Sequence, residues 1–219
     1  MSVPRPHPQY GHLVQHVLGV FVRHQGELSG DVTAGVRKTV PVALTQQFAR
    51  VTPAYIEACR RRAAASSTGD PGWDPPVEDC LDLNWDAWPL PALFRRAGLE
   101  SASVIAIDRA LDGDPGGDIA FLDHDGVYDG MTEPPDLLAP GAVAEIAAAL
   151  DAVDADRVLA AIPPTAEETA TVFRFRVEDI VALMAGIGLV PYVAGALDRL
   201  RAFYAEAARR DLAMVVWID

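Results

Sequence analysis

The last twenty residues, LRAFYAEAARRDLAMVVWID (200–219), decide the fold class of this chain. Leu200, Tyr204 and Ala207 recur at helical spacing, so the first part predicts an amphipathic helix with one apolar stripe. After a short polar break, residues 212–218 form an apolar run of strand length. A helix that leads directly into an apolar strand needs a sheet beside it, so this ending predicts a chain built from both helices and strands.

The first strand is expected near the start of the folded part of the chain. A strand-like segment begins over residues 42–51. Thr52-Pro53 follows, an N-cap residue with proline at the first helical position, and predicts a helix over residues 53–65. Helical spacing then turns Ile56 and Cys59 inward, toward the expected sheet.

The middle of the chain is expected to hold further short elements. Residues 66–76 are rich in Ser, Gly and Pro and predict a loop. Other patterns predict helices starting near Asn84 and over 92–97, 140–150, 153–162, 177–189 and 191–210, and strands over 102–107 and 172–175. Because helices dominate and strands are scattered, we expect a single compact α+β domain with several helices packed on a small mixed sheet.

Residues 1–41 differ in composition from the rest of the chain. They hold four of the five histidines and four basic against two acidic residues, so they carry +2 while residues 42–219 carry −15. Three prolines near the start and the glycines between Gly26 and Gly35 disfavour regular structure. We therefore expect residues 1–41 to be an N-terminal extension, disordered in part, and residues 42–219 to be the folded domain.

The charge balance bears on the class of partner. The chain has a formal net charge of −13 and an isoelectric point near 4.7. Nucleic-acid binding needs clustered Lys and Arg to neutralise phosphates, so the composition argues against it. An acidic surface steers cationic molecules toward itself, so a basic protein is the partner that we expect.

Nothing in the chain predicts export or membrane insertion. The first residues lack the charged start, the apolar run and the cleavage site of a signal peptide, and no stretch approaches about 18 uninterrupted apolar residues. Cys59 and Cys80 do not form a metal-like CxxC pair. We expect a cytoplasmic protein that needs no disulfide or structural metal.

An acidic, glycine-rich loop is the first candidate site. Five residues fall at offsets 1, 3, 6, 7 and 12 of a calcium-binding loop: Asp112, Asp114, Gly117, Asp118 and Asp123. The match is imperfect, because Gly116 stands at the fifth position, Pro115 stiffens the middle and the twelfth residue is Asp rather than Glu. The alternative is a solvated connection in which Asp and Gly satisfy turn geometry.

Histidines supply the other candidate chemistry. His124 lies between Asp123 and Asp125, where it could act as a general base, so a metal-dependent hydrolase or another enzyme using the loop 112–129 is an alternative function. An exposed loop histidine is the simpler interpretation, since no nucleophile motif accompanies it. His12 and His16 share the i, i+4 spacing of a metal pair but lack the Glu of a metalloprotease helix. The only cofactor that the sequence suggests is a divalent cation.

Aromatic residues suggest a contact surface. Trp85 and Trp88 are followed closely by prolines, which break a helix and leave a ring exposed, whereas Phe203 and Trp217 lie on apolar sides of expected elements and predict core. An exposed tryptophan suits a binding hot spot. We therefore name Trp85, Trp88 and Asp125 as candidates for partner contact.

Three segments carry a resemblance to a known family. Residues 81–88, 138–150 and 200–219 resemble, in order and spacing, the YfbM-like family of small bacterial proteins, a domain family of unknown function. The resemblance covers residues 42–219 and implies a fold rather than an activity. Where the family carries a Lys-Ala-Trp-His-like tract, this chain has Asn-Trp-Asp-Ala-Trp-Pro over 84–89 and no histidine. Together with the acidic composition, these features favour a non-catalytic protein-binding module of the antitoxin or immunity type.

Overall fold

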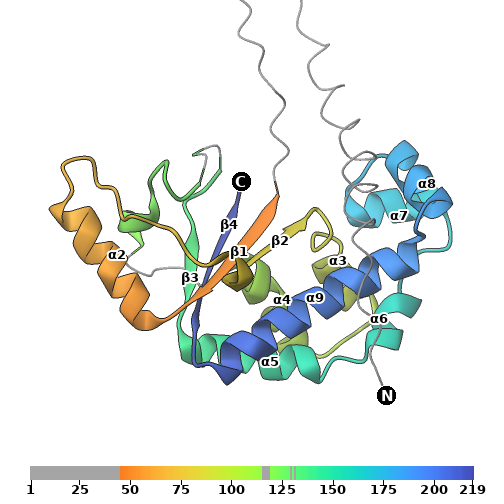
Figure 1. Ribbon diagram of the computed structural model, residues 1–219. Helices are drawn as coiled ribbons and strands as arrows, with labels where there is room; N and C mark the ends of the chain where they lie inside the picture. Colours follow the sequence, from red (N-terminus) through yellow and green to blue (C-terminus); the bar gives the residue numbers. More distant parts are fainter. Residues whose placement is uncertain (1–44, 115–118, 129, 131) are drawn as a thin grey trace, which may run out of the picture.

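A four-stranded antiparallel sheet forms the centre of the molecule (Figure 1). The computed structural model describes residues 45–114, 119–128, 130 and 132–219. The strands are β1 (Gln46–Val51), β2 (Cys80–Asn84), β3 (Asp136–Leu138) and β4 (Ala213–Ile218), and they lie in the order β2-β1-β4-β3. The expected α+β domain is confirmed, with a sheet that is antiparallel throughout rather than mixed.

The closing strand β4 lies in the middle of the sheet. It pairs with β1 on one side, with Phe48 opposite Val216, and with β3 on the other. Thr45 and Asp219 exchange backbone hydrogen bonds at the end of the β1–β4 pair. The apolar run at the end of the chain is therefore a central strand buried on both faces, which explains why its pattern is nearly continuous rather than alternating.

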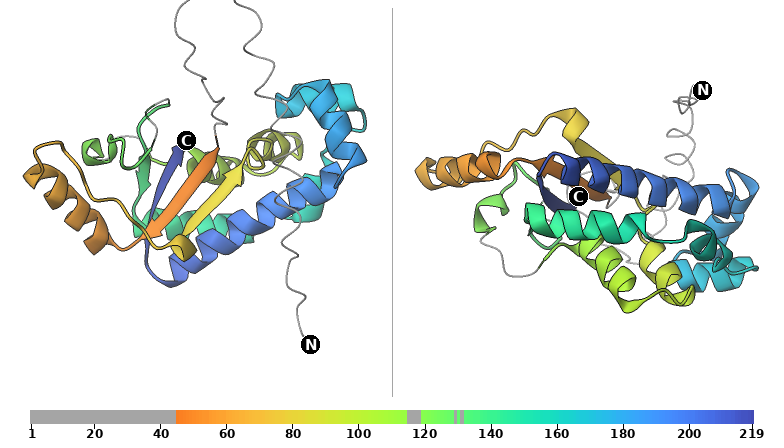
Figure 2. Two further views of the ribbon diagram at one scale, coloured as in Figure 1. Left: turned by 45° about the horizontal axis from the view of Figure 1, so that its top comes forward. Right: turned by 90° about the horizontal axis from the view of Figure 1, so that it is seen from below.

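One face of the sheet carries the main core. The long helix α9 (Leu189–Arg209) packs along α5 (Pro140–Asp151), and both cover this face together with α4 (Ser101–Asp112) (Figure 2). Phe48 stacks edge to face with Phe203 and Tyr204 of α9. The stripe predicted for α9 is confirmed, since Leu200, Tyr204 and Ala207 are all buried.

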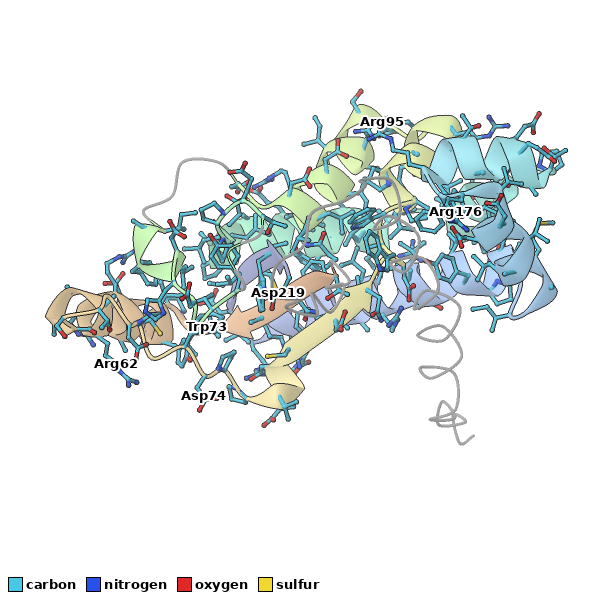
Figure 3. All side chains as sticks on the ribbon, turned by 90° about the horizontal axis from the view of Figure 1, so that it is seen from above. Arg62, Trp73, Asp74, Arg95, Arg176 and Asp219 are labelled. Atoms are coloured by element: carbon cyan, nitrogen blue, oxygen red, sulfur yellow. The ribbon has the colours of Figure 1, made fainter. Side chains whose placement is uncertain are left out.

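The opposite face is covered by α2 (Pro53–Ala65) and the 3-10 turn η3 (Ala120–Leu122). The predicted start of α2 is confirmed: the backbone N–H of Tyr55 donates to Oγ1 of Thr52, and Pro53 occupies the first turn. Ile56 and Cys59 are buried, as expected. Trp73, from the loop after α2, packs edge to face between Tyr55 and Trp217 (Figure 3).

The remaining helices lie toward the end of the molecule that is far from α2 (Figure 2). They are α3 (Leu90–Arg96), α6 (Ala155–Ala160), α7 (Ala166–Phe173) and α8 (Val177–Ala185), while the 3-10 turn η2 (Val77–Asp79) precedes β2. Within the described residues, no single helix is long and apolar enough to cross a membrane; α8 and α9 meet that test only as a pair bent by 90°.

Three sequence predictions of local structure are wrong. Residues 102–107, expected as a strand, lie inside α4, because Ile107, Ala110 and Leu111 bury one helical face. The helix expected from Asn84 is absent from the described fold, since β2 ends there with a left-handed Asn84 and a turn follows. Residues 172–175, expected as a strand, end α7 at a left-handed Arg174.

Candidate functional site

Negative charge is concentrated in one segment of the chain. Residues 108–156 hold thirteen Asp or Glu and one Arg, so they carry a formal charge of −12, against −13 for the whole chain. The described acidic residues at the junction of α4, β3 and η3 form what we call the acidic surface: Asp108, Asp112, Asp114, Asp123, Asp125, Glu133, Asp136 and Glu145. The charges of Asp112, Asp114 and Glu133 act on Asp136, and Arg109 bridges Asp114 to Glu145. Tyr128 in turn senses the charges of Asp123, Asp125 and Glu133.

The densest part of the acidic surface lies where α4 meets β3. Asp112 ends α4 and Asp136 begins β3. The pKa of Asp136 is raised by burial and then by the charges of Asp112, Asp114 and Glu133. The pKa of Asp112 is raised by desolvation and by Asp108, while Arg95 opposes the shift. Like charges thus remain incompletely compensated at this junction.

Arg109 is the one basic residue within this acidic segment. Its Nε and Nη2 atoms donate to the two carboxylate oxygens of Asp114, each at 2.7 Å, and its Nη1 donates to Glu145 at 3.2 Å. Hydrogen bonding to Arg109 holds the pKa of Asp114 below its usual value. Arg95 of α3 contacts both oxygens of Asp108 at 2.8 and 2.6 Å (Figure 3). The two arginines engage Asp108 and Asp114, whereas Asp112 and Asp136 form no ion pair within the part of the chain that the structure describes.

The turn after η3 contributes the rest of the acidic surface. The hydroxyl of Tyr128 donates to Oδ1 of Asp123 at 2.7 Å, and this bond, with burial, raises the pKa of Tyr128 to about 12. The N–H of Gly126 donates to Nδ1 of His124 at 2.9 Å, so that nitrogen is an acceptor in a local turn. Asp125 is exposed. The side chains of this turn therefore serve local structure, with Asp125 facing solvent.

The predicted calcium-binding loop is brought together only in part. Asp112 ends α4, Asp114 lies in the connection after it, and Asp123 follows η3; the last two are engaged by Arg109 and Tyr128. Asp118 lies outside the described residues, as do His12 and His16. Among the residues that the structure describes, no three His, Cys, Asp or Glu side chains are placed to share a metal ion. Metal binding by this loop stays a prediction.

The two candidate tryptophans form a pair in the turn between β2 and α3. The rings of Trp85 and Trp88 meet edge to face, with centroids 4.3 Å apart and planes at 70°. Both side chains are half-buried. The paired rings thus present apolar surface at the molecular boundary while supporting each other, an arrangement suited to contact with a partner.

Between these tryptophans lies a buried carboxyl group. The side chain of Asp86 is only 9% exposed and forms an ion pair with Nη2 of Arg199 from α9. Burial raises the pKa of Asp86, and the charge of Arg199 and the nearby hydroxyl of Tyr192 oppose that shift. Oδ1 of Asp86 and the Tyr192 hydroxyl lie without partners of good hydrogen-bond geometry among the described residues. Sequence reasoning missed this cluster, because its members lie more than a hundred residues apart.

A comparison with protein-family models gives one finding. A model described as "Domain of unknown function (DUF1877)" matches residues 65–217.

The chain belongs to the DUF1877 family.

Searches of curated proteins and of solved structures found no match.

The DUF1877 match begins at the last residue of α2 and ends within β4. It therefore contains the acidic surface, the tryptophan pair and the Asp86 cluster, while residues 1–64 precede it. The family description gives these sites no role.

A second ion cluster, which links the DUF1877 match to β1, has a structural role. Asp79, at the end of η2, accepts hydrogen bonds from Nε of Arg50 at 2.8 Å and from Arg210. Both arginines lower its pKa, with Arg210 the stronger. The guanidinium carbon of Arg50 also lies 4.6 Å from the ring centroid of Phe203. These contacts join β1, η2 and α9, so they fix the fold rather than expose a reactive group.

Proposed function

We propose that this DUF1877 protein is a non-catalytic binding module of the antitoxin or immunity type, which captures a basic protein through its acidic surface. The observation that supports this proposal most strongly is the formal charge of −12 over residues 108–156. Electrostatic complementarity of this kind steers association and selects partners by charge.

The raised pKa values at the α4–β3 junction support a cationic partner. Asp112 and Asp136 are held near each other and near Asp114 at an electrostatic cost to the free protein. An Arg or Lys side chain from a partner that reached this junction would relieve that repulsion on binding. The Trp85–Trp88 pair supplies a second candidate contact, of the aromatic type that dominates many interfaces.

Two finer assignments go with this function. Within DUF1877 we place the chain with the YfbM-like bacterial proteins, on the three segments that resemble them. We also place it in the cytoplasm, because both of its cysteines, Cys59 and Cys80, are free thiols and disulfides are rare in that compartment.

Capture experiments with paired charge variants test the proposed function. The full chain serves as bait in native lysate at low and moderate salt, beside a variant that neutralises four residues of the acidic surface: Asp112→Asn, Asp125→Asn, Glu133→Gln and Asp136→Asn. A control variant removes the same number of charges elsewhere, at exposed positions: Glu167→Gln, Glu168→Gln, Asp198→Asn and Asp211→Asn.

The expected result is a basic protein that binds the native chain and the control variant, is lost from the acidic-surface variant and is released as salt rises. Equal capture by all three chains would contradict a role for the acidic surface. Capture that survives moderate salt but is lost on Trp88→Ala would instead assign the contact to the tryptophan pair.

A further inference from the structure

Helix α8 carries an apolar ridge that the described residues leave uncovered. Val177, Val181 and Met184 follow one another at i, i+4 and i+7 and are 37, 52 and 45% exposed. Val190, the second residue of α9, is 50% exposed. The other side of α8 also buries an apolar residue, Ile180, in the main core. A surface helix normally has one apolar side, so a second apolar side indicates a further contact.

An amphipathic segment of matching character lies in the N-terminal part of the chain. Polar residues and a glycine recur there at i, i+3, i+4, i+7 and i+11: His12, Gln15, His16, Gly19 and Arg23. The positions between them are apolar throughout: Leu13, Val14, Val17, Leu18, Val20, Phe21 and Val22. This spacing predicts a helix over residues 12–23 with a broad apolar face. Because so short a helix is marginal in water alone, it needs a surface to pack against.

The connection to the folded domain is long enough for this segment to reach α8. Residues 24–44 separate it from the first described residue, and extended chain covers about 65 Å over that length. A domain of this size is roughly 40 Å across. Tethering also gives the segment a high effective concentration at the domain surface.

Charge favours the same pairing. Residues 1–41 carry +2, whereas residues 166–185, which include α7 and α8, hold four acidic and two basic residues. A second copy of the chain is less well suited to the ridge, since stable dimers bury about 1,200–2,000 Å². The nine-residue α8 is only about 14 Å long.

We propose that residues 12–23 dock as a helix along α8 and cover the ridge formed by Val177, Val181, Met184 and Val190. The apolar face of the segment then meets the ridge, and Arg23 lies near the acidic residues of α7 and α8. The interaction is intramolecular and does not depend on the proposed partner of the acidic surface.

Amide hydrogen exchange of the full chain tests this docking. We compare the native protein with Val181→Glu, which places a charge on the ridge, and with Ile105→Glu, a matched change of an equally exposed apolar residue on α4. The expected result is exchange over residues 12–23 that is about tenfold slower in the native chain and in Ile105→Glu than in Val181→Glu. Phe21→Glu is expected to abolish the same protection.

Three outcomes would overturn the docking. Fast exchange over residues 12–23 in the native chain would show that the segment is not docked. Protection that persists in Val181→Glu would place its docking site elsewhere. A native dimer that Val181→Glu dissociates, seen by sedimentation velocity, would assign the ridge to a second copy. Unchanged melting temperatures of Val181→Glu and Ile105→Glu would show that the domain is folded in both variants.

Discussion

Gly113 and Asp136 touch where the end of α4 meets the start of β3: a Cβ atom placed on Gly113 would lie 2.3 Å from the Cβ of Asp136. Gly113 also has a φ of +76°, a conformation that other residues adopt only with strain. This contact brings Asp112 and Asp136 together and so creates the densest part of the acidic surface. The charge concentration therefore depends on a backbone approach that only glycine permits.

Gly113→Ala is expected to destabilise the protein by about 2–3 kcal/mol, because the new methyl group meets both backbone strain and the side chain of Asp136. For a domain of this size that lowers the melting temperature by roughly 5–10 °C. Gly69→Ala is the matched control, since Gly69 has a φ of +81° with nothing within 4 Å of an added Cβ. Equal losses of stability in Gly113→Ala and Gly69→Ala would show that the contact with Asp136 is unimportant.

Asp136→Asn is expected to stabilise the protein at pH 7. The pKa of Asp136 is raised in the folded state, so this group binds its proton more tightly there than in the unfolded chain. The contribution of Asp136 to the free energy of unfolding therefore falls as the pH rises from its pKa in the unfolded chain to its higher pKa in the folded protein. In urea unfolding, Asp136→Asn is expected to have a higher free energy of unfolding than the native protein at pH 7. This difference should be smaller at pH 4.

Asp198→Asn, an exposed change on α9, serves as the control for Asp136→Asn. It is expected to leave stability nearly unchanged at both pH values. A loss of stability in Asp136→Asn at pH 7 would mean that its carboxylate has a favourable partner in the folded protein, and the repulsion inferred at the α4–β3 junction would be wrong.

Local signals in the sequence predicted much of the fold. Thr52-Pro53 marked the start of α2, and the spacing of Leu200, Tyr204 and Ala207 identified the buried side of α9. Both signals depend on neighbouring residues only. The strand predicted at residues 102–107 failed because its β-branched residues were weighed above the helical spacing of Ile107, Ala110 and Leu111.

The geometry of the candidate site was harder to predict. The acidic loop was recognised from composition, but its contacts to Asp136 and Glu145 depend on how α4, β3 and α5 pack. The pair formed by Asp86 and Arg199 spans more than a hundred residues and has no spacing that marks it. Contacts of this kind follow from tertiary structure, which a single sequence does not reveal.

Divalent cations are expected to leave the melting temperature at the value set by ionic strength alone. Asp114 and Asp123 are already engaged by Arg109 and Tyr128, so a calcium-like loop would need to break those bonds. Thermal unfolding with millimolar calcium, magnesium or manganese, against sodium chloride of equal ionic strength, measures this. A rise in melting temperature that is specific to one cation and is lost in Asp118→Asn would favour the alternative function, a metal-dependent enzyme.

Asp79→Asn is expected to cost about 2 kcal/mol at pH 7, because it leaves the largely buried Arg50 without its carboxylate. The pKa of Asp79 is lowered, so the stability it contributes is present above its unfolded pKa and is lost as pH falls through the folded one. The difference in urea midpoint between native protein and variant should therefore shrink in acid. Glu206→Gln, in an exposed pair with Arg209, should cost much less; an equal loss would contradict a special role for Asp79.

Arg199→Met is expected to cost about 2 kcal/mol at pH 7, because it leaves the carboxylate of Asp86 buried without its ion pair. The pKa of Asp86 is already raised by burial, and loss of Arg199 raises it further. The carboxyl group is then protonated at a higher pH, so the cost of Arg199→Met falls as the pH is lowered from 7 toward 5. Urea unfolding across that range measures the change.

Tyr192→Phe provides the contrast for Arg199→Met. The hydroxyl of Tyr192 is buried without a well-placed partner among the described residues, so its removal gives up little hydrogen bonding and is expected to cost less than about 1 kcal/mol. A large loss in Tyr192→Phe would show that the hydroxyl supports Asp86 directly. A cost of Arg199→Met that does not change with pH would mean that Arg199 stabilises the protein by packing along α9 rather than by holding the charge of Asp86.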